Sequence, residues 1–262
     1  MLTDLAAREA LHLLLLSKLS QELRPHSFVL KGGVNLRLFF GSPRYSEDVD
    51  LDVDPSAKQA VVRTISALLP SRWLAERLQS VGIERVDYSG RPAKNTDTTV
   101  RFKMAVVNKG GIRLPTRIEA SLRDRSPGDA VTAEAPAQAV IQRYQNAGVE
   151  GLMIPHYPRD PMIRQKIRAL AARSATQARD VFDLYVLADG DVRNADITFL
   201  KQALPARELT EASDRATGIP YEQFRDQVAE FLPDAERAAV GEASWEQRQL
   251  FVVDLIGAIL RG

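Results

Sequence analysis

Between residues 48 and 54 every second residue is an aspartate, and the residues between them are apolar. This strict alternation predicts a strand with one acidic and one apolar face. Same-face residues two apart lie ~6.6 Å along a strand, so Asp48 and Asp50 can share one cation and repel each other without it. Oxygen-only ligation suits Mg²⁺. We therefore predict Mg²⁺ ligation by Asp48 and Asp50, whereas Asp52 and Asp54 fit the alternative of a solvated edge strand ending in a helix cap.

A glycine pair precedes this acidic strand by about fifteen residues. Gly32 and Gly33 follow Lys31 at the end of a short apolar run that predicts a buried strand over 28–30. Two glycines let the backbone approach a phosphate closely, and the free N–H groups at the start of the next helix attract anions. Ser46, just before the acidic strand, can donate to the same phosphates. The alternative is a plain tight turn.

A third carboxylate follows in a predicted β-hairpin. Alternating apolar residues over 100–106 and 112–122 flank an Asn-Lys-Gly-Gly turn, and parity places Glu119 on the polar face. If the hairpin lies beside the acidic strand, Glu119 joins a metal cluster, in which two metals ~3.5–4 Å apart activate an attacking hydroxyl and stabilise the leaving group. The alternative is an ion pair with Arg101 or Lys103. Pro115 indicates an irregular stretch or a sheet edge.

Two later helices combine apolar surfaces with charged side chains. Lys166 and Arg173 lie seven residues apart on one flank of the first helix. Asp180 and Asp183 share one side of the second, which is apolar around most of its circumference. Because buried carboxylates need partners, these residues form either a structural ion network or part of an active site to which Lys166 and one aspartate contribute.

Composition limits the remaining function classes. The 262 residues contain 35 Lys plus Arg, 34 Asp plus Glu and no Cys. The absence of Cys excludes disulfides, thiol nucleophiles and Cys-based metal centres. No apolar run approaches the ~20 residues that span a bilayer, so we expect a cytoplasmic protein without a membrane partner. The three His residues have no ligand spacing, and hydrolase and dinucleotide-binding motifs do not occur.

The coarse pattern predicts an α/β part followed by a helical part. We expect helices over about 4–23 and 34–40, and a third that starts at Asp54-Pro55 and runs to Leu69. Strand signals fade beyond Ser126-Pro127-Gly128, where helical patterns with proline-containing joints begin.

The motifs as a set resemble those of the AbiEii/AbiGii toxin family of nucleotidyltransferases, MenT-like proteins of type IV toxin–antitoxin systems. The resemblance is carried by residues 31–37 and 44–51, and by the later Lys and Arg-Asp motifs over 166–170 and 179–185. It implies an α+β fold. A DNA polymerase β-like core, with a mixed sheet and flanking helices, would occupy residues 1–158, and a helical domain contributing Lys and Asp to the active-site cleft would occupy residues 159–262.

The resemblance also implies a reaction and its participants. Such enzymes transfer NMP from an NTP, with Mg²⁺, to an acceptor hydroxyl, which is a tRNA 3′ end in characterised relatives, and a cognate antitoxin protein opposes them. By position, the resemblance assigns metal binding to Asp48 and Asp50. It assigns triphosphate binding to Lys31, Gly32, Gly33 and Ser46. Together with the metal pair, Lys166 and Asp180 would be the catalytic residues. Asp183 and Arg173 are further possible site residues.

Two alternatives remain open from the sequence. A degenerate, non-catalytic nucleotidyltransferase fold would bind RNA or an antitoxin and would bind NTP without turnover. Within the enzyme class, the acceptor can instead be a small molecule or a protein side chain. For an RNA acceptor, the sequence offers a backbone path along four arginines of the helical part, Arg159, Arg164, Arg168 and Arg173.

Overall fold

The computed structural model describes residues 3–123, 130–149 and 151–262. The chain forms two compact units. The first, here called the sheet unit, comprises residues 1–39 and 45–157. The second, the helical unit, comprises residues 158–262 together with the short segment 40–44. Residues 126–128, beyond which the strand signals were expected to fade, lie outside the described residues.

The sheet unit is built on a mixed β-sheet with the strand order β3-β5-β6-β2-β1-β8-β7, and β4 pairs with β5 beside this path. Parallel pairing joins β2 to β6 and β1 to β8, and the other pairs are antiparallel. The strands are β1 (Phe28–Lys31), β2 (Asp48–Val53), β3 (Ile83–Tyr88), β4 (Lys94–Asn95), β5 (Thr99–Asn108), β6 (Arg113–Ser121), β7 (Thr132–Glu134) and β8 (Ile154–His156). The prediction of a mixed sheet with flanking helices is confirmed.

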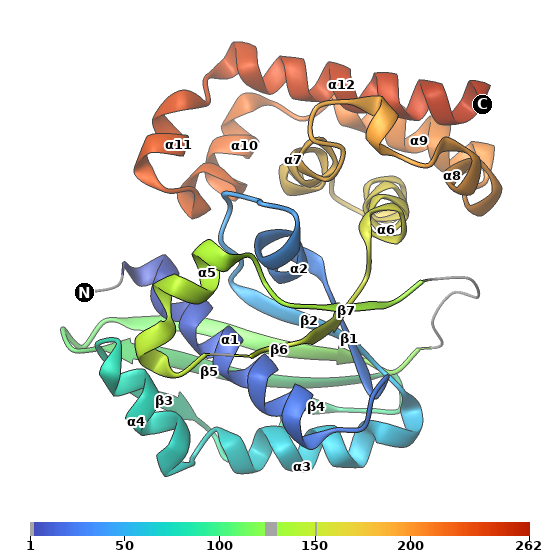
Figure 1. The fold of residues 1–262 in the computed structure, drawn as a ribbon. Coiled ribbons are helices and arrows are strands. Elements are labelled where there is room, and N and C mark those ends of the chain that lie inside the picture. The colour runs from blue at the N-terminus through green and yellow to red at the C-terminus, as the bar shows by residue number, and fades with distance from the viewer. Residues whose placement is uncertain (1–2, 124–129, 150) are drawn as a thin grey trace. The chain divides into compact units, whose positions relative to one another are not determined.

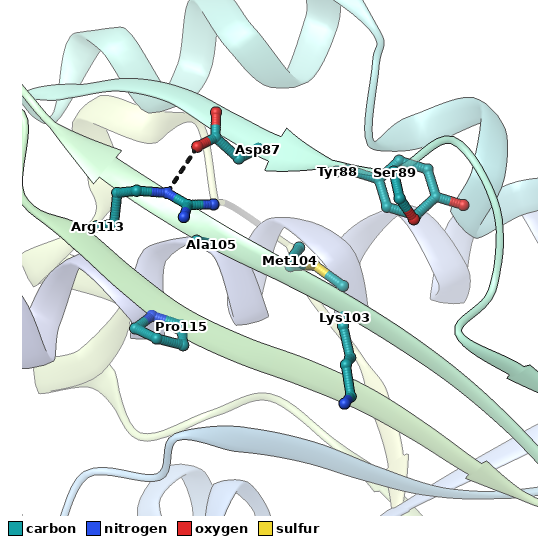
Figure 2. A pocket seen from close by; sticks show the side chains of 8 residues that line it. All are labelled: Asp87, Tyr88, Ser89, Lys103, Met104, Ala105, Arg113 and Pro115. Atoms are coloured by element: carbon teal, nitrogen blue, oxygen red, sulfur yellow. Dashed lines mark hydrogen bonds and ion pairs between the residues drawn. The ribbon is translucent and has the colours of Figure 1, made fainter.

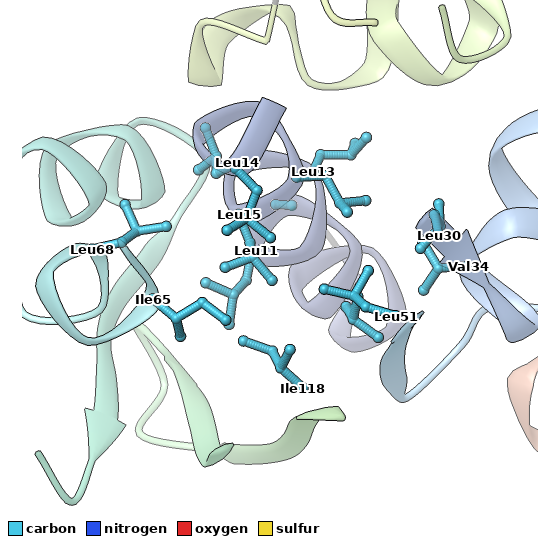
Figure 3. Packing of buried hydrophobic residues seen from close by; sticks show 14 of the residues in the cluster. Leu11, Leu13, Leu14, Leu15, Leu30, Val34, Leu51, Ile65, Leu68 and Ile118 are labelled. Carbon is cyan, nitrogen blue, oxygen red and sulfur yellow. The ribbon is translucent and has the colours of Figure 1, made fainter. Parts of the chain in front are cut away.

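Helices cover the apolar face of this sheet, as Figure 1 shows for α1, α3 and α4. The helices of the unit are α1 (Asp4–Glu22), α2 (Gly32–Phe39), α3 (Lys58–Leu68), α4 (Arg72–Ser80) and α5 (Gln138–Arg143). Leu11 and Leu15 of α1 pack with Leu51 of β2, Ile65 of α3 and Ile118 of β6 in one fully buried cluster (Figure 3). This core fixes which face of each strand is buried, so the charged side chains of β2, β5 and β6 lie on the opposite face.

Most local elements agree with the sequence pattern, and the differences have local causes. Thr3 caps α1 through the N–H of Ala6, as the sequence predicts. The helix after β1 begins at Gly32 rather than Val34, so the glycine pair forms its first turn. Asp54 caps a 3₁₀ turn over Pro55–Ala57, and α3 starts only after it. The expectation of helices alone beyond residues 126–128 is wrong, because β7 and β8 are strands of three residues each, too short to show alternation.

Pro115 lies within β6, which is an interior strand of the sheet. The pairing of β6 with β2 begins only at Arg117. At Pro115 the strand therefore has a partner on the β5 side alone, where Ala105 lies opposite. The missing N–H of proline costs no ladder hydrogen bond at such a local edge, which explains how the strand tolerates it.

The helical unit contains seven α-helices in its described residues. They are α6 (Arg159–Ala172), α7 (Ala178–Leu187), α8 (Ile197–Ala203), α9 (Ala206–Thr217), α10 (Tyr221–Gln227), α11 (Asp234–Ala239) and α12 (Glu242–Arg261). The long helix α12 packs against α7 and α9, and α6 packs against α7 and α9. Among all described helices, none has both the length and the apolar character needed to cross a bilayer.

Candidate active site

The polar face of β2 carries the predicted metal pair. Burial along β2 alternates as the sequence predicts, with the aspartates on the accessible face and Val49, Leu51 and Val53 in the core. Asp48 accepts the backbone N–H of Arg117 at 3.2 Å, and it forms an ion pair with the Arg117 guanidinium at 2.9 Å. Burial raises the pKa of Asp48, Arg117 opposes the rise, and the negative charges of Asp50 and Glu47 add to it. A cation at this position would relieve the repulsion between the two carboxylates.

The glycine pair lies directly against this carboxylate pair. Lys31 is the register partner of Asp50, and Gly32 follows with a φ of +71°, a conformation that side chains other than glycine rarely adopt. A Cβ atom on Gly32 would lie 2.4 Å from Oδ2 of Asp50. The first turn of α2 therefore depends on glycine for two reasons, its backbone conformation and the space that the Asp50 carboxylate occupies.

We expect Gly32→Ala to weaken binding of NTP in the presence of Mg²⁺ by at least about tenfold, because the new methyl group displaces the Asp50 carboxylate. Isothermal titration calorimetry measures the effect. Gly111→Ala is the matched control, since Gly111 has a φ of +77° with nothing within 4 Å of an added Cβ. Both variants carry a backbone strain of roughly 1–2 kcal/mol. Equal NTP affinity in the two variants would contradict a role of Gly32 in the site.

Glu119 lies beside the metal pair but bonds to an arginine. In the parallel register of β2 and β6, Asp50 is directly opposite Glu119, as expected if the hairpin lies next to the acidic strand. The Glu119 carboxylate pairs with Arg101 of β5 at 2.6 Å, so the structure forms the cross-strand ion pair that the sequence offered as the alternative. Within residues 3–123, 130–149 and 151–262, no three acidic or histidine side chains are gathered closely enough to hold a metal ion.

Lys31 and Ser46, predicted to bind the triphosphate, have partners within the sheet unit. The Lys31 ammonium lies 2.5 Å from Oδ1 of Asp52, and the Tyr157 hydroxyl donates to Oδ2 of the same carboxylate at 2.8 Å. The prediction that Asp52 is a solvated edge residue is wrong, because β2 lies between β1 and β6 and brings Asp52 beside Lys31. The Ser46 hydroxyl donates to the backbone carbonyl of Asp48 at 2.9 Å and fixes the entry into β2.

In the helical unit, Asp180 and Asp183 of α7 are both fully buried and share one lysine. Lys166 of α6 lies 3.1 Å from Asp180 and 2.6 Å from Asp183. Arg173 contacts Asp180 at 3.0 Å, and Arg44 contacts both oxygens of Asp183 at 3.0 Å. We call these five residues the buried ion network.

The charges of this network favour its ionised form. Burial alone would raise the pKa of Asp183, but Arg44 and Lys166 hold it below the usual value. Burial would lower the pKa of Lys166, but the two aspartates raise it above the usual value. The network holds three cations and two carboxylates, so the structural pairing considered from the sequence is present, and one positive charge remains uncompensated within it.

Arg44 and Arg117 are the partners that sequence reasoning did not assign. Arg44 belongs to the same motif as Asp48, four residues earlier, yet it is part of the helical unit and lies 139 residues from Asp183. The signal available in the sequence was the presence of two aspartates on an otherwise apolar helix, which require more than one buried cation. Nothing in the sequence specified which arginine supplies the second charge.

Comparisons with known proteins bear on the fold and the family of the chain. A search of curated proteins finds no match. Among solved structures, JHP933 from Helicobacter pylori is similar with a TM-score of 0.61 and 19% identity, over 98% of this chain and 92% of that one. MenT4, a nucleotidyltransferase toxin from Mycobacterium tuberculosis, is similar with a TM-score of 0.63 and 17% identity, over 98% of this chain and 87% of that one. At these identities the two likenesses establish the fold.

The family assignment comes from the sequence profile of the nucleotidyl transferase AbiEii toxins of type IV toxin–antitoxin systems, which matches residues 14–255. The match includes β1, the glycine pair, the acidic strand and the buried ion network. Because it covers most of the 262 residues, the protein belongs to the AbiEii family of nucleotidyltransferase toxins.

Proposed function

We propose that the protein transfers a nucleoside monophosphate from an NTP to the hydroxyl of an RNA acceptor, a tRNA 3′ end, with Mg²⁺, and that a cognate antitoxin protein opposes this activity. The observation that carries the proposal is the contact between the first turn of α2 and the Asp50 carboxylate, with Asp48 on the same strand face. A phosphate-binding turn and a pair of metal-ligating carboxylates are the two parts that nucleotidyl transfer needs in one place.

The donor set fits a hard divalent cation. Asp48 and Asp50 offer only carboxylate oxygens, and the pKa of Asp48 is raised by burial, as expected for a carboxylate placed to bind a cation. When bound, Mg²⁺ would neutralise charge on the phosphates and lower the pKa of the attacking hydroxyl. Glu119 would have to exchange Arg101 for the metal to become a third ligand. Its ligation stays a prediction.

The residues of the chain then have distinct tasks in the transfer. The acceptor hydroxyl loses its proton to water, and its oxygen forms a bond to the α-phosphorus. The bond from that phosphorus to the bridging oxygen breaks, and pyrophosphate leaves with the electron pair of that bond. The N–H groups of the first turn of α2 would hold the triphosphate, and Lys31 would exchange Asp52 for a phosphate oxygen. The roles of Lys166 and Asp180 as catalytic partners stay predictions from the family resemblance.

Incubation with each α-³²P-labelled NTP, total RNA and Mg²⁺ tests the proposal. We expect label in RNA with at least one NTP, and loss of the label when EDTA removes the metal and its return when excess Mg²⁺ is added. Label in protein or in a small molecule instead would identify another acceptor class. NTP binding without label in any fraction would contradict the enzyme and favour a non-catalytic module that binds RNA or the antitoxin.

A further inference from the structure

A groove lies on the polar face of the sheet beside the metal pair. It has a volume of about 480 Å³ and is lined by residues 87–89 at the end of β3, residues 103–105 of β5, and Arg113 and Pro115 of β6 (Figure 2). This volume is within the range of pockets that enclose drug-sized ligands, which corresponds to one or two nucleotides rather than a double helix. Neither the proposed phosphate site nor the metal pair includes any of these residues.

The strand register connects the groove to the metal pair. Lys103 of β5 is directly opposite Arg117 of β6, and Arg117 is directly opposite Asp48 of β2. Residues directly opposite one another in neighbouring strands point to the same face. Since adjacent strands lie about 4.8 Å apart, the Lys103 strand is roughly 10 Å from the Asp48 strand. The Lys103 end of the groove is therefore separated from Asp48 by the width of β6, at Arg117.

The charge of the groove suits a polyanion. Asp87 is its carboxylate, and it is bonded to Arg85 and Arg113 at 2.9 Å each. Arg85 also pairs with Glu84 at 2.8 Å, so the charges of this cluster are balanced. Among the residues that line the groove, Lys103 and Arg113 are two cations against the one carboxylate of Asp87. Lys103 is exposed and has no ion pair or hydrogen bond with any residue that the structure describes. An exposed, unpaired lysine beside compensated charges offers a contact to a phosphate at no cost in lost internal pairs.

The floor of the groove is formed by small apolar side chains. Ala105 and Pro115 are register partners on β5 and β6, and they separate Lys103 from Arg113 along the groove. A methyl group and a proline ring leave room for the flat face of a ribose or a base. A positively charged groove is typical of sites for single-stranded nucleic acid, and here Ala105 and Pro115 take the place of the aromatic platform that such sites use.

The four arginines of the helical unit that the sequence offered as an RNA path have internal contacts, by contrast. Arg164 is 4% exposed, Arg168 pairs with Glu208 at 3.3 Å, and Arg173 is part of the buried ion network. Side chains already engaged in this way offer fewer contacts to a phosphate than Lys103 does.

We propose that the groove binds the single-stranded 3′-terminal nucleotides of the RNA acceptor, with Lys103 on a backbone phosphate and a ribose or base over Ala105 and Pro115. This inference rests on the proposed function and names where its acceptor lies. It locates acceptor recognition in the sheet unit, on the face that also carries Asp48.

Fluorescence anisotropy with two labelled RNA hairpins tests the groove without NTP. One hairpin has a four-nucleotide single-stranded 3′ overhang, and the other has the same stem with a blunt end. We expect Lys103→Glu to weaken binding of the overhang RNA by about tenfold and to reduce the salt dependence of that binding by roughly one phosphate contact. Lys109→Glu, which makes the same charge change in the β5–β6 turn, is the control and leaves both affinities within about twofold of wild type.

Equal weakening by Lys103→Glu and Lys109→Glu, or equal weakening for blunt and overhang RNA, overturns the inference. The inference is also overturned, in favour of a protein segment, if an acidic peptide binds the wild type more tightly than the overhang RNA does and this binding is lost in Lys103→Glu. The labelling assay separates this failure from that of the proposed function. If the wild type labels RNA and Lys103→Glu has an unchanged KM for RNA, the groove assignment fails while the transferase stands.

Discussion

Asp48→Asn is expected to reduce NTP-dependent labelling of RNA by at least about a thousandfold. The amide keeps the size of the side chain and one oxygen that can accept the N–H of Arg117, but it removes the negative charge needed to hold Mg²⁺. Loss of a metal that stabilises phosphate charge costs several kcal/mol of transition-state stabilisation, and about 4 kcal/mol corresponds to this factor.

The same substitution should leave the free energy of unfolding within ~1 kcal/mol of the wild-type value. The ion pair with Arg117 is partly exposed, with 43% of the arginine side chain accessible, so its loss costs little. Removal of the repulsion from Asp50 offsets part of that cost, because this repulsion contributes to the raised pKa of Asp48. Initial labelling rates and urea unfolding curves measure the two effects.

Asp54→Asn is the matched control for this experiment. Asp54 follows the same strand, and its carboxylate caps the 3₁₀ turn through the N–H of Ser56, a task that asparagine also performs. We expect wild-type labelling from this variant. Retained labelling in Asp48→Asn would exclude the carboxylate pair as the metal site.

Asp183→Asn is expected to destabilise the protein by about 3–5 kcal/mol. Its carboxylate is fully buried and contacts both Arg44 and Lys166. In the variant, these two cations and Arg173 share Asp180 as the one remaining carboxylate of the network. Breaking a buried pair by neutralising one partner leaves an uncompensated buried charge, which is far more costly than losing an exposed pair.

Urea unfolding followed by circular dichroism measures this loss, with Glu208→Gln as the control. Glu208 also pairs with an arginine of α6, but the side chains of that pair are 38% and 41% exposed. We expect the control to lose less than ~1 kcal/mol. Equal losses in both variants would show that the buried ion network contributes no more than a surface pair.

Activity of the folded Asp183→Asn protein at low temperature adds a second readout. If the role of Asp183 is purely structural, we expect a labelling rate per folded molecule close to that of the wild type. A rate reduced by a hundredfold or more in folded protein would instead assign Asp183 to the chemistry, the role considered for it as the alternative to Asp180.

The elements with local patterns could be predicted from the residues alone. The alternation over 48–54 specified both the strand β2 and its acidic face, since side chains on successive residues of a strand point to opposite sides. The Thr3 cap and the hairpin of β5 and β6 were determined in the same way, by hydrogen bonds and turns formed within a few residues. The order and types of the motif residues were sufficient for the family resemblance, which the profile match confirms.

The pairing of the charged side chains, in contrast, depends on contacts that form when the chain folds. Glu119 had Asp50 beside it and two cations opposite or diagonal, and the fold paired it with Arg101. Lys31 bonded to Asp52, and Arg44 bonded to Asp183 across 139 positions of the chain. Ion pairs form between whichever side chains packing brings within a few ångströms, and partners far apart in sequence leave no periodic signal. The type of chemistry was therefore readable from the residues, whereas the bonding of each charged group depended on how the strands and helices pack.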